Sequence, residues 1–213
     1  MIRLRQAIIL GSGGQCRVVA SILKNCDDHE ILGIIDLGNP GSGERIMDLP
    51  VLGSVACLED YIDNKNIDVY LAIGKNEIRR AWWHKLRNLK ISMPNLISPC
   101  AMIDCYSIMG EANVICAKAF IGPETKIGNN NLINTGAVIE HEVLIGNHCH
   151  LATSSVVAGR SRVGDDCFIG ASATVIDGID VKANTIIGAG ATLVCDINEP
   201  GGIYIGTPAR KMR

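Results

Sequence analysis

An aliphatic residue recurs at every sixth position through the second half of the chain. From Ile97 to Leu193, each position of this series is Ile, Leu, Val or Met. Neither the 3.6-residue period of an amphipathic helix nor the two-residue period of a half-buried strand produces such a pattern. A fixed six-residue period predicts a parallel β-helix in which each hexad forms one face of a triangular coil. The aliphatic side chains then point inward, and stacked coils bury a continuous column that no single coil could bury alone.

Two further positions of the hexad carry small residues. A glycine often follows the aliphatic residue, where the chain bends and a Cβ would be in the way. These glycines are Gly110, Gly122, Gly128, Gly146, Gly164, Gly170 and Gly188. The fifth position is usually Ala, Ser or Thr, which we interpret as a tight corner. The register runs without insertion from 97 to 193, so no large loop is expected to leave the coil. The tail that follows departs from the register and is expected to cap the open end.

The first half of the chain alternates strand and helix patterns, as is typical of an α/β domain. Strands are expected at 6–10, 30–36 and 68–74, helices at 15–25, 55–62 and 77–89, and a loop at 38–53. This order predicts half of a Rossmann-like fold with a ligand crevice at the carboxyl ends of the strands. Pro94 and Pro99 break any helix before the hexads begin. We therefore place the α/β domain at 1–93 and the β-helix with its C-terminal cap at 94–213.

The crevice of the α/β domain gathers residues that suit a nucleotide. The first strand is followed by Gly11, Ser12, Gly13 and Gly14 and then by a helix, so backbone N–H groups and the helix dipole converge on an anion site. The alternative is a simple tight turn, because Arg17 stands near the place of the third glycine of a dinucleotide fingerprint.

Two other strand ends complete the predicted crevice. Asp36 ends the second strand, where doubly wound folds contact a ribose or base. Gly74, Lys75 and Asn76 end the third strand. Half of a dinucleotide fold suits a mononucleotide better than NAD.

The helix expected at 77–89 carries four cations on its polar side, namely Arg79, Arg80, Lys85 and Arg87. Trp82, Trp83 and His84 lie in its middle, and we interpret them as interface or partly buried packing residues.

Composition excludes several classes of protein. The net charge is −2 and no basic run is long, so neither nucleic acid nor an anionic membrane is an expected partner. No apolar stretch approaches the length of a membrane span, and the short apolar run near the start leads into glycines, unlike a signal peptide. The nine cysteines have no paired spacing, which suits a reducing cytoplasm and argues against a disulfide framework.

The histidines of the hexad region lie close together at 141, 148 and 150. His141 stands near a turn, outside the aliphatic column, between Glu140 and Glu142. An imidazole accepts a proton near neutral pH, and an adjacent carboxylate can orient the ring and raise its basicity. The alternative is an ordinary surface histidine. The spacing of His148 and His150 could suggest a metal, but no carboxylate or cysteine flanks them at ligand spacing, so no metal site is expected.

Four segments together resemble a known family. The segments GSGG, AIGKNEIRR, NTGAVIEHE and IGTPARKM are similar to the NeuD/PglD-type acetyltransferases of the sialic-acid and bacillosamine pathways. The hexads alone would indicate only the wider hexapeptide acyltransferase superfamily. The resemblance covers essentially the whole chain, and it implies an α/β half-Rossmann-like domain followed by an all-β left-handed parallel β-helix.

The resemblance also implies how the active site is assembled. It implies a homotrimer with acetyl-CoA in a groove between neighbouring subunits and a nucleotide-linked amino sugar in the α/β domain. His141 matches the catalytic base, with Glu142 as its partner. The matches to coenzyme contacts are His150, Gly159, Ala171 and Ala189, and those to the nucleotide-sugar site are Gly13, Gly14, Asp36, Gly74 and Asn76. Two positions depart from the family, because Gln15 replaces a common His and Ala189 replaces the Gly of some members.

We therefore expect direct acetyl transfer from acetyl-CoA to a sugar amine, with His141 as general base and a backbone N–H such as that of Gly159 stabilising the oxyanion. The resemblance favours a UDP-linked 4-amino-4,6-dideoxy sugar over a GDP-linked one. O-acetylation of sialic-acid-type sugars is an alternative that differs only in the acceptor. A non-catalytic, nucleotide-binding β-helix scaffold is a second alternative, which the Glu140-His141-Glu142 triplet disfavours.

Overall fold

The computed structural model of the chain describes residues 4–26, 28–38, 44–62 and 67–212. Contacts divide the chain into two compact units, with the boundary between Pro99 and Cys100. The sequence analysis placed this boundary between residues 93 and 94. None of the helices in the described ranges is long and apolar enough to cross a membrane.

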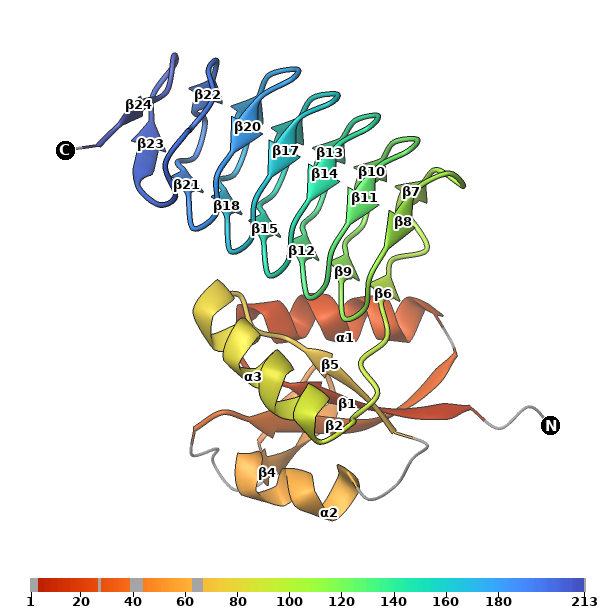
Figure 1. Ribbon diagram of the computed structural model, residues 1–213. Coiled ribbons are helices and arrows are strands. Elements are labelled where there is room, and N and C mark those ends of the chain that lie inside the picture. Colours follow the sequence, from red (N-terminus) through yellow and green to blue (C-terminus); the bar gives the residue numbers. More distant parts are fainter. Residues whose placement is uncertain (1–3, 27, 39–43, 63–66, 213) are drawn as a thin grey trace. The chain divides into compact units, whose positions relative to one another are not determined.

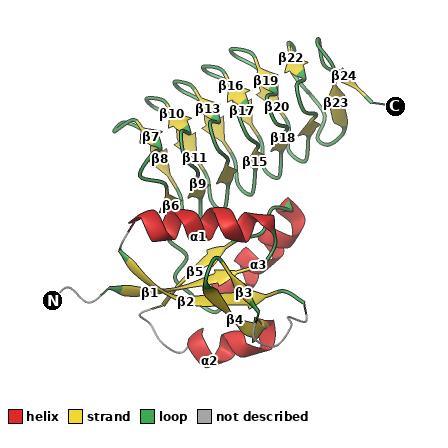
Figure 2. Ribbon diagram, turned by 180° about the vertical axis from the view of Figure 1, so that it is seen from behind, coloured by secondary structure: helices red, strands yellow, loops and turns green. Residues whose placement is uncertain are grey.

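The first unit is an α/β layer built on a five-stranded sheet in the order β3-β4-β2-β1-β5 (Figure 1). Its strands are β1 (Arg5–Leu10), β2 (His29–Asp36), β3 (Arg45–Ile46), β4 (Leu49–Ser54) and β5 (Ile67–Leu71). Its helices are α1 (Gly14–Cys26), a 3₁₀ turn η1 (Val55–Leu58), α2 (Glu59–Ile62) and α3 (Asn76–Asn88). In both views α1 covers one face of the sheet and α2 lies beyond the other (Figures 1 and 2).

Strand β1 is the centre of this sheet. It pairs in parallel with β2 on one side and with β5 on the other. Its residues 7–10 are completely buried, which explains why they are all aliphatic. Because the chain leaves β1 toward β2 and later returns to its other side as β5, the strand order reverses at β1. Open α/β sheets bind ligands at the carboxyl ends of the strands at such a reversal.

The prediction of a loop at 38–53 is wrong for the second half of that range, which forms a β-hairpin. Strands β3 and β4 pair antiparallel through a turn at Met47 and Asp48, whose φ values are 50° and 63°. Strand β4 then pairs in parallel with β2 and extends the sheet. Non-glycine residues seldom occupy positive φ, so the sequence carries no usual turn signal there. Residues 39–43 of the predicted loop lie outside the described residues.

The second unit is the predicted left-handed parallel β-helix, with short strands on three faces (Figure 1). The β7 sheet contains β7 (Met102–Ile103), β10 (Phe120–Ile121), β13 (Val138–Ile139), β16 (Val156–Val157), β19 (Thr174–Val175) and β22 (Thr192–Leu193). The β8 sheet contains β8 (Ile108–Met109), β11 (Lys126–Ile127), β14 (Leu144–Ile145), β17 (Arg162–Val163) and β20 (Asp180–Val181).

The third face, the β9 sheet, includes the C-terminal strands. Its strands are β9 (Val114–Ile115), β12 (Leu132–Ile133), β15 (His150–Leu151), β18 (Phe168–Ile169), β21 (Ile186–Ile187), β23 (Ile203–Ile205) and β24 (Arg210–Lys211), and β6 (Leu96–Ile97) precedes the coils in the chain. Strand β23 pairs with β21 out of the six-residue register, and β24 pairs antiparallel with β23. The tail therefore adds strands at the end of the stack.

The interior of the coil confirms the aliphatic column and corrects the interpretation of the fifth hexad position. Aliphatic residues such as Ile121, Ile139 and Val157 are completely buried and form one core cluster. The small residues of the fifth position, such as Ala137 and Ala173, are also completely buried. They are small because they share the narrow interior with the column. The chain instead turns at the fourth position, where residues such as Glu142 adopt a φ near 58°.

Each coil lies directly on the next, because paired residues such as Phe120 and Val138 belong to successive coils. The glycines after the aliphatic residues are needed for this approach. A Cβ on Gly122 would come within 2.9 Å of the backbone at Glu140 and His141 in the next coil. Polar side chains stack in the same way, since Asn129 Nδ2 donates to Asn147 Oδ1 at 3.0 Å across an offset of 18 residues.

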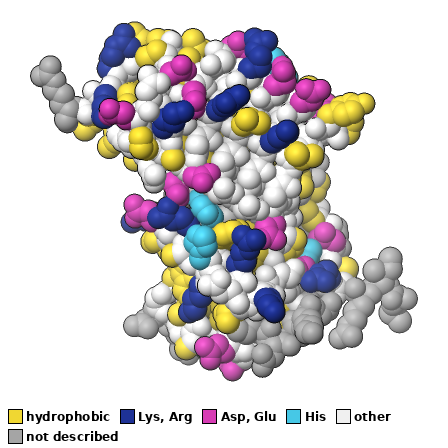
Figure 3. Space-filling view, viewed as in Figure 1, with side chains coloured by type: hydrophobic (Ala, Val, Ile, Leu, Met, Phe, Trp, Pro, Cys, Tyr) yellow, Lys and Arg dark blue, Asp and Glu magenta, His cyan; other side chains and the backbone are white. Residues whose placement is uncertain are grey.

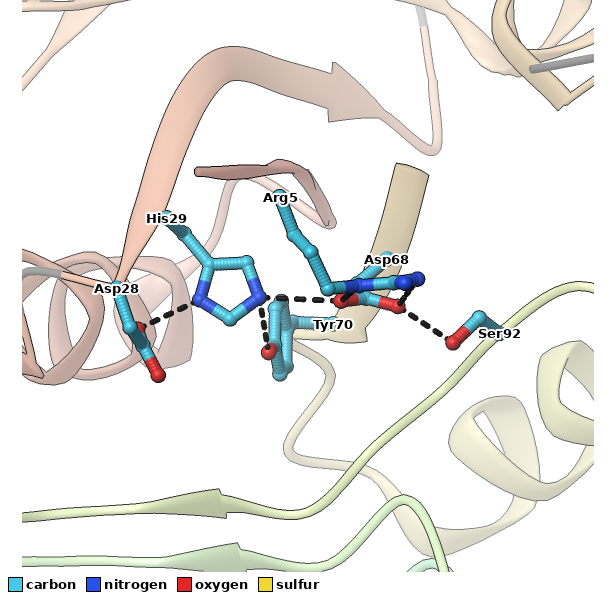
Figure 4. Close-up of polar contacts among 6 residues, drawn as sticks. All are labelled: Arg5, Asp28, His29, Asp68, Tyr70 and Ser92. Carbon is cyan, nitrogen blue, oxygen red and sulfur yellow. Dashed lines mark hydrogen bonds and ion pairs between the residues drawn. The ribbon is translucent and has the colours of Figure 1, made fainter. Parts of the chain in front are cut away.

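A buried carboxylate ties the amino ends of the strands together in the first unit. The network comprises Arg5, Asp28, His29, Asp68, Tyr70 and Ser92 (Figure 4). Asp68 is only 2% exposed and accepts two hydrogen bonds from Arg5, at 2.6 and 2.7 Å, one from His29 at 3.0 Å and one from Ser92. Burial alone would raise the pKa of Asp68, but the hydrogen bonds from Arg5, Ser92 and His29 lower it below the usual value.

Asp68→Asn is expected to lower the free energy of unfolding by about 2–3 kcal/mol, because it removes a charged acceptor from these donors. Asp28→Asn is the matched control, since Asp28 is 64% exposed, and it should cost less than about 1 kcal/mol. Urea unfolding at neutral pH measures both. Because the pKa of Asp68 is lowered in the folded state, its contribution to stability is present above the pKa of an unfolded aspartate and is lost in acid. The difference in unfolding free energy between the wild type and Asp68→Asn should therefore shrink as the pH falls. Equal effects of the two variants would contradict this account.

Candidate active site

His141, Gly159 and Asp177 occupy the same corner of three successive coils. This corner, which we call the His141 corner, joins the strands of the β7 sheet to those of the β8 sheet. The backbone N–H of Arg160 donates to the carbonyl oxygen of His141 at 3.0 Å, and that of Gly178 donates to the carbonyl oxygen of Gly159 at 2.9 Å. The repeat of the coil thus places side chains that are far apart in the sequence directly above one another.

The His141 ring is in contact with the neighbouring carboxylate. Nδ1 of His141 lies 3.0 Å from Oε2 of Glu142. The side chains are 43% and 49% exposed, so both are accessible to a substrate. A carboxylate accepts only, so this contact requires a proton on Nδ1 and leaves Nε2 of a neutral ring with its lone pair. The arrangement can therefore take up a proton at Nε2.

Gly159 leaves room for this ring. A Cβ at position 159 would lie 2.5 Å from both Cε1 and Nε2 of His141. No side chain fits there unless the imidazole moves. The backbone N–H of Gly159 also has no acceptor within the described part of the chain. The corner therefore brings a basic nitrogen and an available N–H donor together.

Two residues of this corner were not predicted from the sequence. Arg160 Nη2 and Asp177 Oδ2 form an ion pair at 2.7 Å, and both side chains are more than half exposed. An Asp177 oxygen lies 3.1 Å from the place that a Cβ on Gly159 would occupy. A signal for both was available, because one coil of 18 residues leads from Glu142 to Arg160 and from Gly159 to Asp177.

The other predicted coenzyme contacts lie elsewhere on the coil. Ala171 and Ala189 are exposed at the turns that join the β9 sheet to the β7 sheet, a second corner that we call the Ala171 corner. His150 lies on β15 of the β9 sheet, with its ring edge-on to Phe168 at 5.0 Å between centroids. One chain therefore does not bring these three residues together with His141 and Gly159.

Two hollows lie on the β8 sheet, and the smaller one reaches the turn that carries His141. The smaller, of about 410 Å³, is lined by residues that include Tyr106, Glu142 and Leu144. The larger, of about 710 Å³, runs along the β8 sheet and contains the side chains of Arg162 and Lys182. Lys182 is paired with Asp180 at 2.6 Å. Both hollows are open to the surface, and acidic and basic side chains line each of them.

The first unit brings the predicted crevice residues together at the carboxyl ends of β1, β2 and β5. Ser12 donates a hydrogen bond from its hydroxyl to Asp36. Gly11 has a φ of 111°, and a Cβ there would lie 2.8 Å from the carbonyl oxygen of Ala72. Only glycine lets β1 and β5 approach so closely. Gly74 to Asn76 follow Ala72, so they lie at the end of the strand next to Gly11 to Gly14.

Within the described residues, no group of three or more His, Cys, Asp or Glu side chains is placed to hold a metal. On the face shown in Figure 3, basic and acidic side chains are interspersed and neither sign dominates. That face offers no continuous basic surface to a polyanion.

Family models match both units of the chain. The model of the PglD N-terminal domain matches residues 6–86. The model of the bacterial transferase hexapeptide (six repeats) matches residues 124–159 and 160–194. A search of curated protein sequences finds no match.

Solved structures match the chain along its whole length. PerB from Caulobacter crescentus, solved in complex with CoA and GDP-perosamine, shares 31% identity with a TM-score of 0.89, over 100% of this chain and 99% of PerB. The acetyltransferase domain of PglB from Neisseria gonorrhoeae shares 28% identity with a TM-score of 0.91, over 98% of this chain and 100% of the domain. WeeI from Acinetobacter baumannii shares 18% identity with a TM-score of 0.63, over 97% and 99% of the two chains.

Gly159→Ala is expected to displace the His141 ring from Glu142, because the added methyl carbon would lie only 2.5 Å from Nε2 and Cε1 of the ring. Gly136→Ala is the matched control, since its φ of 67° resembles the corner values of non-glycine residues and its Cβ would meet only Ser154 Oγ, at 3.4 Å. Imidazole resonances of His141 followed by NMR report the displacement. A spectrum of Gly159→Ala that matches the wild type at His141 would contradict this geometry.

Proposed function

The chain belongs to the NeuD/PglD-type acetyltransferases of the hexapeptide-repeat acyltransferase superfamily, and we propose that it transfers the acetyl group of acetyl-CoA to the amine of a nucleotide-linked amino sugar. The observation that carries this proposal is the His141 corner, where Glu142 orients the imidazole and Gly159 makes room for it. The family membership supplies the class of reaction, and the corner supplies a base for it.

The solved relatives support the coenzyme and the class of acceptor. The PglB acetyltransferase domain has been solved in complex with acetyl coenzyme A, and PerB with CoA and GDP-perosamine. PerB is described as a GDP-perosamine N-acetyl transferase, and it has been solved with one histidine replaced by alanine and by asparagine. We extend acetyl-CoA and a nucleotide-linked amino sugar from these relatives to this chain.

In the proposed reaction, the neutral amine of the sugar attacks the thioester carbonyl while Nε2 of His141 takes up a proton from the nitrogen. Glu142 keeps the other ring proton on Nδ1 and stabilises the imidazolium that forms. The backbone N–H of Gly159 donates to the oxyanion of the tetrahedral intermediate. The carbon–sulfur bond then breaks and the amide remains on the sugar. The departing thiolate of CoA takes the proton from Nε2 of His141. No acyl-enzyme forms.

The proposed acceptor is a 4-amino sugar carried by a nucleoside diphosphate. We place the nucleotide in the crevice of the α/β unit, where Ser12 and Asp36 are in contact and Gly74 to Asn76 lie at the adjacent strand end. The resemblance favours UDP, whereas the complex with PerB contains a GDP-linked sugar. UDP-linked and GDP-linked acceptors are therefore compared in the same assay.

CoA release from acetyl-CoA is the assay, with UDP-linked and GDP-linked 4-amino sugars and a free sialic acid as acceptors. We expect turnover with one amino sugar, and His141→Ala should lower kcat by roughly 10²- to 10⁴-fold, the usual contribution of general-base catalysis. His84→Ala, which removes an exposed histidine of α3, should retain activity.

The outcomes separate the alternatives. Release only with the sialic acid would assign the chain to the O-acetylating branch of the family. Binding of a nucleotide without release from any acceptor would favour the non-catalytic scaffold. Full activity of His141→Ala would exclude His141 as the base.

We further propose that the active enzyme is a homotrimer. In one chain, a face of the coil separates His141 and Gly159 from the other predicted coenzyme contacts, which are His150, Ala171 and Ala189. A groove between neighbouring subunits can join the Ala171 corner of one chain to the His141 corner of the next, and so complete the coenzyme site.

Sedimentation at enzyme concentrations used for the assay should give the mass of three chains, because one chain lacks a complete coenzyme site. Mixing inactive His141→Ala with an Ala171→Trp variant is the sharper test. Subunit exchange should restore part of the activity, since some grooves then contain neither substitution. A monomer that retains full turnover would contradict the proposal.

A further inference from the structure

Arg79 does not lie on the polar side of α3, where the sequence analysis placed it. Arg79 is only 2% exposed, and its side chain is one of the largest that are fully buried in the described part of the chain. Nη1 of Arg79 donates to the carbonyl oxygens of Ile73 and Gly74 at 3.1 and 3.2 Å, and Nη2 donates to Oδ1 of Asn76 at 2.9 Å. A buried guanidinium thus holds the inner side of the turn between β5 and α3.

This contact determines where the N–H groups of the turn point. In a trans peptide the carbonyl of one residue and the N–H of the next point in opposite directions. Because the carbonyls of Ile73 and Gly74 face the buried Arg79, the N–H groups of Gly74 and Lys75 face away from it. Gly74 and Lys75 are both exposed, and no acceptor for either N–H is found in the parts of the chain that the structure describes.

The two N–H groups belong to the crevice that the proposed function assigns to the nucleotide. They lie at the carboxyl end of β5, which pairs with β1, and β1 ends at Gly11 to Gly14. They also immediately precede the first turn of α3, a helix of 13 residues whose amino end carries partial positive charge. A phosphate in the crevice would face the N–H groups of Gly74 and Lys75, which point the same way, and the guanidinium of Arg79 lies behind them.

We propose that Arg79 is a positioning residue for the phosphates of the nucleotide-linked sugar. It touches neither the sugar nor the coenzyme. It turns the Ile73–Gly74 and Gly74–Lys75 peptides so that their N–H groups face the diphosphate, and it fixes the side chain of Asn76 beside them. This inference rests on the proposed function, because that function supplies the diphosphate.

Titration calorimetry with UDP and GDP tests the inference on wild type, Arg79→Lys, Arg79→Gln and Arg87→Gln. Arg87→Gln removes the same charge from the exposed far end of α3 and should leave binding unchanged. Arg79→Gln should weaken binding of the preferred diphosphate by about 10- to 100-fold, the range expected when a charged hydrogen-bonding group is lost. Arg79→Lys keeps the charge but cannot reach three acceptors at once, so its loss should be smaller.

Two readouts separate positioning from a general structural role. The affinity for uridine or guanosine should not change in Arg79→Lys or Arg79→Gln, since a nucleoside has no phosphate. In CoA-release kinetics, KM for the nucleotide sugar should rise by the same factor as the dissociation constant, while kcat and KM for acetyl-CoA stay at wild-type values. Equal loss for nucleoside and diphosphate, or no loss in Arg79→Gln, would overturn the inference.

A measurement on the wild type keeps the test independent of how the variants fold. The backbone N–H resonances of Gly74 and Lys75 should shift when UDP or GDP is added and should not shift with the nucleoside. Unchanged resonances in a protein that binds the diphosphate would overturn the inference and leave the proposed function standing. A wild type that binds neither nucleotide and releases no CoA would instead remove the proposed function.

Discussion

Stacking of each coil on the next is the constraint on which the β-helix depends. Backbone N–H groups of one coil donate to carbonyls of the following coil along all three faces, as between Phe120 and Ala137 or Gly122 and Ile139. This ladder fixes the distance between coils, and two consequences follow. The interior admits the aliphatic residue of each hexad and a neighbour at the fifth position that is usually small, such as Ala137 or Ala173. The corners admit only residues whose side chains clear the coil above. Glycine is required wherever that clearance is absent, as at Gly122.

The same constraint creates the candidate active site. A corner side chain normally stands under the corner of the next coil, and at His141 that next corner is a glycine. The imidazole can therefore lie against the coil while Glu142 holds its Nδ1. The crevice of the α/β unit, which we propose for recognition of the nucleotide, has a different origin: it lies at the ends of strands that meet where the strand order reverses. The proposed catalysis by the corner and the proposed recognition by the crevice thus depend on two separate features of the fold.

Periodicity and strand order could be predicted from the sequence because they are local or repeat exactly along the chain. The hexads located the coil, and β1, β2, β5, α1 and α3 form near their expected positions. The β3–β4 hairpin was missed because its turn uses Met47 and Asp48 at positive φ. Arg79 was misplaced because helical spacing cannot distinguish a solvated cation from one that donates to the carbonyls of the preceding turn. Arg160 and Asp177 were missed because the six-residue period does not show which side chains stack, whereas the full coil of 18 residues does.

The position of the acetyl group in the product decides whether the chain acetylates a sugar amine with His141 as base. The wild-type protein is incubated with acetyl-CoA and the nucleotide-linked 4-amino sugar that it turns over, and the product is analysed by NMR. The account predicts an amide on the sugar nitrogen, formed by the wild type and nearly absent with His141→Ala. An ester on a sugar hydroxyl, or an amide formed equally well without His141, would contradict it.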